Sequence, residues 1–557
     1  MNGDPRSEVG RVIGTRDSQP LEFWVGVSPV SYLQLDDVVA VTTAVPERGE
    51  VTLYGLVDDV RAFYEGAKFD SDVFRVQDGV LPVDVATVAH VSVTRVEPEL
   101  FVPPRPGQPV RRATGEERDK ALYFDSMANR FAIGLARDEE PLWGNLDFID
   151  GTRGAHVNIS GISGVATKTS YALFLLYGLF HSDVLGADRT NSRAIIFNVK
   201  GEDLLFLDKP NARLSEEEAE RYATLGLPTG HFQDISLWAP ASHSAIGEPA
   251  PDTGSRQEGV TPYFWSLRQF CQERLLRFLF AEADSESSQI GFAVTVAERY
   301  LETKTDGQRG RGWIEIDGQR LTDFHDLVSH ITDNADAVFG GSRVAQATQE
   351  AFIRRLHAAA EAAGHLIRRT DTEEEEARYR IDWRAGQVNV IDIHNLPDRA
   401  KRFVVGVVLR QMLADKDRTG QRRPLAFVVL DELNKYAPAE GWSPIKEVVL
   451  DIAERGRSLG VILVGAQQTA SEVERRVVAN ASYRVVGRLD TAEAQRGEYG
   501  FLTAAARARS AILKPGHMFL HQPEIPVPLL VQFPFPSWAT RSEEVAAATD
   551  IPRGFRR

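Results

Sequence analysis

A glycine-containing loop between an apolar strand and an apolar helix constrains the fold of this chain more than any other feature. The segment HVNIS (156–160) has the composition of a short buried strand, and SYALFLLYGLF (170–180) has that of a helix. A second apolar strand, RAIIFNV (193–199), follows. This order of strand, turn, helix and strand is typical of the βαβ unit of a parallel sheet.

The alternation of strands and helices continues in the second half of the chain. Further strands of the same sheet are predicted at VNVIDI (388–393), LAFVVLD (425–431), GVILVGA (460–466) and YRVVGRL (483–489). Helix-like segments separate most of these strands. We therefore expect an α/β core with a mostly parallel sheet.

Two regions differ from this core. The first 100 residues alternate short apolar runs with turn residues, which favours a small antiparallel barrel. A later region is rich in Leu, Ala, Glu and Arg at helical spacing, which favours a helical insertion. The expected domains are an N-terminal β-barrel (1–100), a Pro-rich linker (101–117), the first half of the core (118–260), the helical insertion (261–380), the second half of the core (381–522) and a C-terminal arm (523–557).

Charge and cysteine content exclude several classes of protein. The formal net charge is −15, which argues against a basic protein that coats nucleic acid but allows a basic channel inside an acidic exterior. Cys271 is the only cysteine, so neither an internal disulfide nor a multi-Cys zinc site is expected. No run of about 18 apolar residues predicts a membrane helix, and the N-terminus lacks the apolar segment of a secretory signal. We expect a cytoplasmic protein with no membrane contact.

The loop SGISGVATKTS (160–170) has the features of a phosphate-binding loop. Such a loop directs backbone N–H groups and a helix N-terminus at an anion, and glycines allow the phosphates to approach closely. Lys168 would bind the β- and γ-phosphates, and the Thr169 hydroxyl would bind Mg²⁺. The full set of expected nucleotide contacts is Gly161, Gly164, Val165, Ala166, Thr167, Lys168, Thr169 and Ser170.

The spacing of this loop departs from the usual G-x-x-x-x-G-K-[ST] pattern. Gly161 and Lys168 are one residue further apart, and Thr167 stands where the second glycine should precede the lysine. Taken alone, the segment could also be a glycine-containing βα turn with an incidental lysine.

The segment PLAFVVLDELNKYAP (424–438) places two carboxylates at the end of a buried strand. Asp431 would bind Mg²⁺, and Glu432 would polarise the attacking water. A strand followed by an acidic helix cap is the alternative. Because both motifs follow strands and occur in the right order, together they predict a P-loop ATPase that uses ATP and Mg²⁺.

The segment AERGRSLGVILVGAQQTASEV (453–473) adds an amide and two arginines. Gln467 ends a strand beside that of Asp431, where its amide could sense the γ-phosphate. Arg455 and Arg457 precede this strand, and an arginine there could stabilise transition-state charge on the ATP of a neighbouring subunit. Ordinary surface arginines are the alternative.

Together these segments resemble the HerA-type hexameric ATPases, which are relatives of the FtsK translocases. The resemblance spans nearly the whole chain, except the helical insertion, where only the placement matches. The segments that carry it are EVGRVIGT, LEFWVGV, DDVVAVTT and VTLYGLVDDV near the N-terminus, then HVNISGISG, AIIFNVKGED, VLDELNKYAP, AERGRSLGVILVGAQQ, ILKPGHMFL and PEIPVPLLVQFPFP. It implies a RecA-like P-loop NTPase core, mostly parallel, with a barrel similar to the HerA N-terminal (HAS) barrel and a helical-bundle insertion.

The resemblance also implies a function and site roles. The chain would form a homohexameric ring that moves double-stranded DNA by ATP hydrolysis, as a translocase or helicase. Its partner would be a NurA-like or other effector nuclease, in DNA end processing and repair or in antiviral (phage) defence. Lys168, Thr169, Asp431 and Glu432 would form the ATPase site, Gln467 would be the sensor and Arg457 the trans-acting finger. The segment 523–536 would reach an adjacent subunit.

The second predicted strand departs from the family pattern. Asn198 replaces the expected aspartate, although Glu202 is nearby, and a neutral amide cannot serve as a base. Two other functions stay open. One is a slowly hydrolysing, nucleotide-binding hexameric scaffold that organises an effector nuclease. The other is a secretion or conjugation ATPase, which the barrel-like N-terminus and the lack of a membrane segment disfavour.

Overall fold

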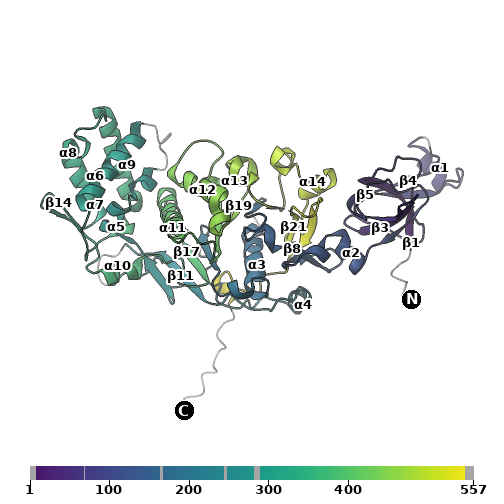
Figure 1. Ribbon diagram of the computed structural model, residues 1–557, viewed down its shortest axis with the longest axis horizontal. Helices are drawn as coiled ribbons and strands as arrows, with labels where there is room; N and C mark the ends of the chain where they lie inside the picture. Colours follow the sequence, from purple (N-terminus) through teal and green to yellow (C-terminus); the bar gives the residue numbers. More distant parts are fainter. Residues whose placement is uncertain (1–7, 68, 163–166, 244–247, 281–288, 546–557) are drawn as a thin grey trace, which may run out of the picture. The chain divides into compact units, whose positions relative to one another are not determined.

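The computed structural model describes residues 8–67, 69–162, 167–243, 248–280 and 289–545. Figure 1 labels the helices and strands of the chain, which divides into two compact units. The first comprises Met1–Leu146 and Tyr483–Phe533, and the second comprises Asp147–Ser482 and Pro534–Arg557. Each unit therefore combines segments that are distant in the sequence.

The first unit begins with a closed six-stranded barrel, which confirms the predicted N-terminal fold. Its strands are β1 (Glu8–Val12), β2 (Glu22–Val27), β3 (Val38–Val45), β4 (Gly49–Tyr64), β5 (Val85–Glu97) and β6 (Pro109–Arg112), in the order β1-β2-β5-β4-β3-β6. Alternate side chains, such as Phe23 and Val25, fill the interior. The last strand lies in the Pro-rich segment expected to be a linker. Residues 109–112 form a strand instead of a linker because the buried side chain of Val110 completes the barrel core.

An antiparallel sheet forms the rest of the first unit. Its strands are β7 (Arg130–Leu135), β8 (Pro141–Asn145), β20 (Tyr483–Val486), β21 (His517–His521) and β22 (Leu529–Gln532), in the order β20-β21-β22-β7-β8. The helices of this unit are α1 (Asp72–Gln77), α2 (Glu116–Ala121) and α14 (Ala504–Ser510). The predicted strand at 483–489 is thus present as β20, which pairs antiparallel with β21. An apolar run does not encode strand direction, which depends on the partner strand.

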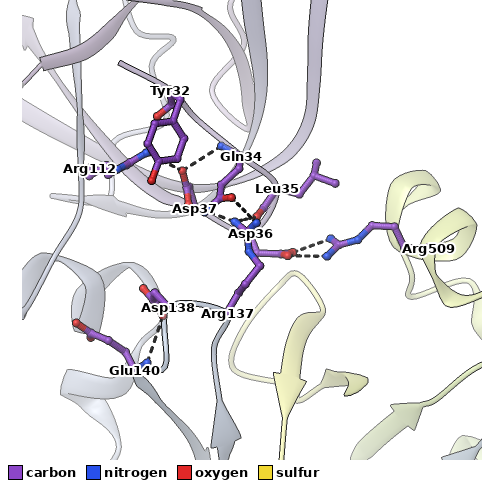
Figure 2. Close-up of polar contacts among 10 residues, drawn as sticks. All are labelled: Tyr32, Gln34, Leu35, Asp36, Asp37, Arg112, Arg137, Asp138, Glu140 and Arg509. Atoms are coloured by element: carbon purple, nitrogen blue, oxygen red, sulfur yellow. Dashed lines mark hydrogen bonds and ion pairs between the residues drawn. The ribbon is translucent and has the colours of Figure 1, made fainter. Parts of the chain in front are cut away.

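Charged side chains join the barrel to this sheet and α14 within the first unit (Figure 2). Asp36, in a barrel loop, forms a bidentate ion pair with Arg509 of α14, with distances of 2.8 and 2.7 Å. The next residue, Asp37, lies 3.3 Å from Arg112 and 3.6 Å from Arg137. Burial raises the pKa of Asp37 even though these two arginines oppose the change. The cluster ties segments far apart in the sequence into one unit.

The described residues of the second unit contain seven neighbouring strands that pair in parallel, so the predicted mostly parallel sheet is confirmed. Its strands are β9 (Val157–Ser160), β10 (Arg193–Asn198), β11 (Ile235–Pro240), β12 (Val260–Tyr263), β17 (Val388–Asp392), β18 (Ala426–Asp431) and β19 (Val461–Gln467), in the order β12-β11-β17-β10-β18-β19-β9. Every residue of β17, β18 and β19 is buried, because helices cover both faces of the sheet. The fold is therefore α/β with a mostly parallel sheet.

Helices connect these strands in the second unit. They are α3 (Thr167–His181), α4 (Glu216–Thr224), α11 (Asp398–Thr419), α12 (Pro444–Leu459) and α13 (Arg475–Ala479). Local sequence sets the ends of α12. The Ser443 hydroxyl accepts a hydrogen bond from Lys446 N, Pro444 occupies the first turn, and Gly460 ends the helix with a φ of 68°. Since the strands are parallel, their carboxyl ends meet at one edge of the sheet.

The predicted insertion is helical and shares its core with α11. It contains α5 (Leu267–Gln272), α6 (Gln289–Thr305), α7 (Phe324–Asp333), α8 (Ala335–Phe339), α9 (Gln346–Ala363) and α10 (Glu373–Tyr379). Two short strand pairs accompany these helices. In one, β13 (Trp265–Ser266) pairs with β16 (Ile367–Arg368), and in the other, β14 (Ile314–Ile316) pairs with β15 (Gln319–Leu321). Figure 1 shows α6, α7, α8 and α9 gathered at one end of the unit. Burial raises the pKa of the Cys271 thiol, so this cysteine behaves as a small core residue.

None of the helices in the described part of the chain combines the length and apolarity that a bilayer crossing requires.

Candidate nucleotide-binding site

A cavity of about 390 Å³ opens at the carboxyl edge of the parallel sheet, where ligands bind in α/β folds of this kind. It is formed by the start of α3, the end of β10 with the turn that follows, the end of β18, and a segment near the C-terminus. Its lining residues are Ile162, Lys168, Thr169, Ser170, Leu173, Phe197, Asn198, Val199, Lys200, Asp203, Leu204, Asp431, Thr540, Arg541 and Glu544. The two predicted motifs thus meet in one cavity.

The first turn of α3 brings a buried lysine to the cavity. Lys168 is only 5% exposed, and its Nζ donates a hydrogen bond of 2.7 Å to the backbone oxygen of Gly161. Burial lowers the pKa of Lys168, while Asp431 opposes that change. An ammonium held beside Gly161 in this way is positioned to bind a phosphate. Gly164, Val165 and Ala166 lie outside the described residues, as does the side chain of Thr167, so their phosphate contacts stay predictions.

The expected Mg²⁺ ligands are in direct contact. Thr169 Oγ1 donates a hydrogen bond of 3.1 Å to Asp431 Oδ2, although the two residues are 262 positions apart in the sequence. Asp431 is 4% exposed at the end of β18. A hydroxyl and a carboxylate on neighbouring elements are the oxygen donors that Mg²⁺ prefers. The site thus fits the metal that the motifs predict.

Glu432 follows directly and has an unusual backbone. Its φ is 57°, which lies in the left-handed region that residues other than glycine rarely adopt. Backbone strain of this kind often marks a functional residue. Burial favours a raised pKa for the carboxyl. An ion pair with Lys200 and a hydrogen bond with Gln468 outweigh burial and hold the pKa of Glu432 below its ordinary value. The group is therefore a carboxylate at neutral pH, as a residue that polarises water must be.

Lys200, which the sequence reasoning did not single out, contacts both carboxylates. Its Nζ lies 3.1 Å from Asp431 Oδ2 and 2.7 Å from Glu432 Oε1. Burial alone would lower the pKa of Lys200, but the two acids raise it above the ordinary value. The available signal was a lysine in the turn after a predicted strand. Lys200 can contact Asp431 and Glu432 only because β10 is the neighbour of β18 in the sheet, and this strand order was not predicted from the sequence.

Asn198, the residue that departs from the family pattern, stands beside another carboxylate. Its Nδ2 donates hydrogen bonds of 2.8 Å to Asp392 Oδ1 and to the backbone oxygen of Gly201. Asp392 is fully buried at the aligned position of β17, 2.9 Å from the ring of His394. Burial raises the pKa of Asp392, although His394 opposes this. An aspartate at position 198 would face this carboxylate, so the amide removes a repulsion and fixes the turn after β10.

The two glutamines at the end of β19 have different surroundings. Gln467, the expected sensor, is fully buried, and its Nε2 donates hydrogen bonds of 2.8 Å to both Asn158 Oδ1 and Ser160 Oγ. Both amide hydrogens of Gln467 are thus engaged by β9. Gln468 is exposed and hydrogen-bonds Glu432. Of the two amides, Gln468 is the one that contacts a carboxylate of the site.

Arg457 lies at the opposite edge of the sheet from the cavity of its own chain. Because α12 precedes β19, the end of α12 meets the amino ends of the strands. Arg457 donates hydrogen bonds of 3.1 and 2.9 Å to the backbone oxygens of Gly151 and Thr152. The seven residues of β19 separate the two edges by about 20 Å. Arg457 therefore cannot reach a phosphate beside Lys168 of the same chain. Arg455 is paired with two surface aspartates.

A segment near the C-terminus closes one side of the cavity. Arg541 Nε and Nη2 pair with the Asp203 carboxylate at 2.8 and 3.0 Å, and Leu204 N donates a 2.9 Å hydrogen bond to Thr540 O. Part of the predicted arm, Leu529–Gln532, forms β22 within its own chain. The contact of residues 523–536 with an adjacent subunit stays a prediction.

No family model and no curated protein matches the chain. VirB4 of Thermoanaerobacter pseudethanolicus is similar with 17% identity, 73% of this chain and 96% of that chain covered, and a TM-score of 0.44. The plasmid coupling protein TrwB in complex with ADP and Mg²⁺ is similar with 11% identity, coverages of 70% and 88%, and a TM-score of 0.43. The genome packaging NTPase B204 from Sulfolobus turreted icosahedral virus 2 shows 12% identity, coverages of 27% and 68%, and a TM-score of 0.21. At these identities and TM-scores, none of the three assigns a family or a function to this chain.

Proposed function

We propose that this chain is an ATPase that binds ATP and Mg²⁺ in the cavity between α3 and β18. The observation that carries the proposal is the hydrogen bond between Thr169 and Asp431, with Lys168 and Glu432 beside it. Lys168 binds the phosphates, and Thr169 and Asp431 hold the metal. Glu432 orients the attacking water and accepts its proton. When bound, Mg²⁺ neutralises charge on the phosphates. Mg²⁺-dependent release of phosphate from ATP by the purified chain tests the proposal.

We further propose that the ATPase is a ring-shaped double-stranded DNA translocase, assembled as a homohexamer. The resemblance to HerA-type ATPases supports this function and its nuclease partner, in DNA end processing or phage defence. The position of Arg457 gives independent support for a shared site. An arginine that cannot reach the nucleotide of its own chain is suited to that of a neighbour. The mass of the purified protein tests the ring, and turnover that rises with linear duplex tests the coupling to DNA.

Replacing Arg457 with Lys is expected to lower ATP turnover by about 100-fold or more while ATP binding stays unchanged, because only the transition state of a neighbouring subunit loses its contact. Steady-state phosphate release and equilibrium binding of an ATP analogue measure the two effects. Arg455→Lys, two residues away on the same helix, is the matched control and should retain turnover. Mixing the Arg457 variant with a Glu432→Gln variant should restore part of the activity, because some interfaces then contain both native residues. Absence of any restoration in mixed rings would contradict a site shared between subunits.

A nucleotide-binding scaffold is the second candidate function. Lys200 neutralises Asp431 and Glu432, and both amide hydrogens of Gln467 are engaged. These contacts must rearrange before hydrolysis, which favours slow turnover. A scaffold should bind ATP and organise its partner without DNA-stimulated hydrolysis.

A further inference from the structure

The acidic pair of the site has a built-in counterion. Asp431 and Glu432 are adjacent, mostly buried carboxylates, and two such charges are costly in a site without a cation. Lys200 Nζ contacts both, at 3.1 and 2.7 Å. Lys168, the other lysine of the cavity, donates a hydrogen bond to the oxygen of Gly161, and its charge also acts on Asp431 and Glu432. Lys200 is thus a cation that bridges the two acids.

The contact also overlaps the expected position of the metal. Lys200 and the Thr169 hydroxyl both approach the same oxygen, Asp431 Oδ2, each at 3.1 Å. A cation bound by Thr169 and Asp431 would lie close to the ammonium, and two cations cannot share that place without strong repulsion. Binding of the metal must therefore move Lys200.

The turn that carries Lys200 is anchored independently of the acids. Asn198 Nδ2 donates to the Gly201 oxygen and to Asp392, and Gly201 adopts a φ of 56°, which favours glycine. The backbone on either side of Lys200 is thus fixed, whereas its side chain is half exposed in the cavity. Only the side chain has to rotate for the ammonium to leave the acids.

We propose that the Lys200 ammonium competes with the metal for Asp431 and Glu432, and that it moves to the terminal phosphate of the nucleotide when the metal binds. This inference rests on the proposed ATPase function and adds a specificity residue to it. While it is paired with the acids, Lys200 prevents them from binding a metal without nucleotide. In the loaded site it contacts a phosphate that a nucleoside triphosphate has and a diphosphate lacks. The charge on the chain is unchanged throughout, because one ammonium only exchanges one anionic partner for another.

The test begins with the metal alone. Mn²⁺, which is visible by electron paramagnetic resonance, is titrated into the nucleotide-free full-length protein. Lys200→Met should bind Mn²⁺ about tenfold more tightly than the native protein, a factor typical of coupling between two ligands that compete for one site. Lys209→Met is the matched control, because Lys209 is similarly exposed and is paired with an aspartate, Asp208, that does not line the cavity. Equal Mn²⁺ affinity of Lys200→Met and native protein would overturn the proposal.

A second measurement tests the contact with phosphate. At saturating Mg²⁺, Lys200→Met should bind a nonhydrolysable ATP analogue at least several-fold more weakly than the native protein, while its affinity for ADP is unchanged. Lys200→Arg keeps the charge and should retain the native affinities for both nucleotides and for Mn²⁺, which also controls for folding. Equal losses for the ATP analogue and ADP would overturn the phosphate assignment. If the native protein binds neither nucleotide, the proposed function itself fails, whereas native binding with unaltered Lys200→Met affinities removes only the role of Lys200.

Discussion

Replacing Glu432 with Gln is expected to lower the ATP turnover number by about 100- to 1000-fold and to leave nucleotide affinity unchanged. Glutamine keeps the shape of the side chain but cannot accept the proton of the attacking water. Although burial opposes it, Lys200 holds the pKa of Glu432 below its ordinary value, so the native group is ionised at neutral pH. Steady-state phosphate release gives the turnover number, and equilibrium binding of an ATP analogue gives the affinity.

The matched control for this variant is Glu440→Gln, an exposed glutamate shortly after the same strand. It should retain native turnover. Unchanged turnover in Glu432→Gln would contradict the assigned role of this carboxylate. The same variant separates the two candidate functions when it is tested with a partner nuclease. A motor-dependent complex should lose the nuclease activity in Glu432→Gln, and a scaffold should keep it.

Replacing Lys168 with Ala is expected to weaken the binding of Mg²⁺–ATP by roughly 30-fold or more, because the phosphates lose a largely buried charge-assisted contact. Turnover at ordinary ATP concentrations should disappear with it. The nucleotide-free protein should not be destabilised, since burial already disfavours the charged lysine and lowers its pKa. Calorimetric titration measures the affinity, and thermal unfolding measures the stability.

The control for Lys168 is Lys435→Ala. Lys435 is half exposed, lies 3.8 Å from Asp398 and does not line the cavity. Its loss should leave nucleotide affinity unchanged. Native affinity in Lys168→Ala would mean that the loop after β9 does not bind the phosphates.

The fold was predictable where a residue pattern has one physical solution. Continuous apolar runs such as β18 and β19, each followed by a helix or a polar turn, fit a parallel sheet covered on both faces. The same pattern was ambiguous at 483–489, because a short apolar strand fits a parallel or an antiparallel sheet. Prolines at 103–109 suggested a linker, yet the barrel needed Val110 to close its interior. In both cases the structure depends on contacts with segments far away in the sequence, and a single sequence does not reveal those contacts.

The site was predictable to the extent that each motif carries its own chemistry. Lys168 with Thr169, and Asp431 with Glu432, were found from local patterns, and the structure brings them together. Lys200 was missed because its role arises only where the turn after β10 meets the end of β18. Asp392 and Arg541 were missed for the same reason, since their contacts join strands or segments that are distant in the sequence. Strand order, which a single sequence does not reveal, decides which residues share an edge.

We expect the cavity beside Lys168 and Asp431 to hydrolyse ATP. The most direct test is the rate of phosphate release from ATP by the purified full chain, with and without Mg²⁺ and with and without linear duplex DNA. We expect release that requires Mg²⁺, that increases when duplex is added, and that is absent from Lys168→Ala under the same conditions. Phosphate release that is undetectable in all four conditions, or that is identical in native protein and Lys168→Ala, would contradict the claim.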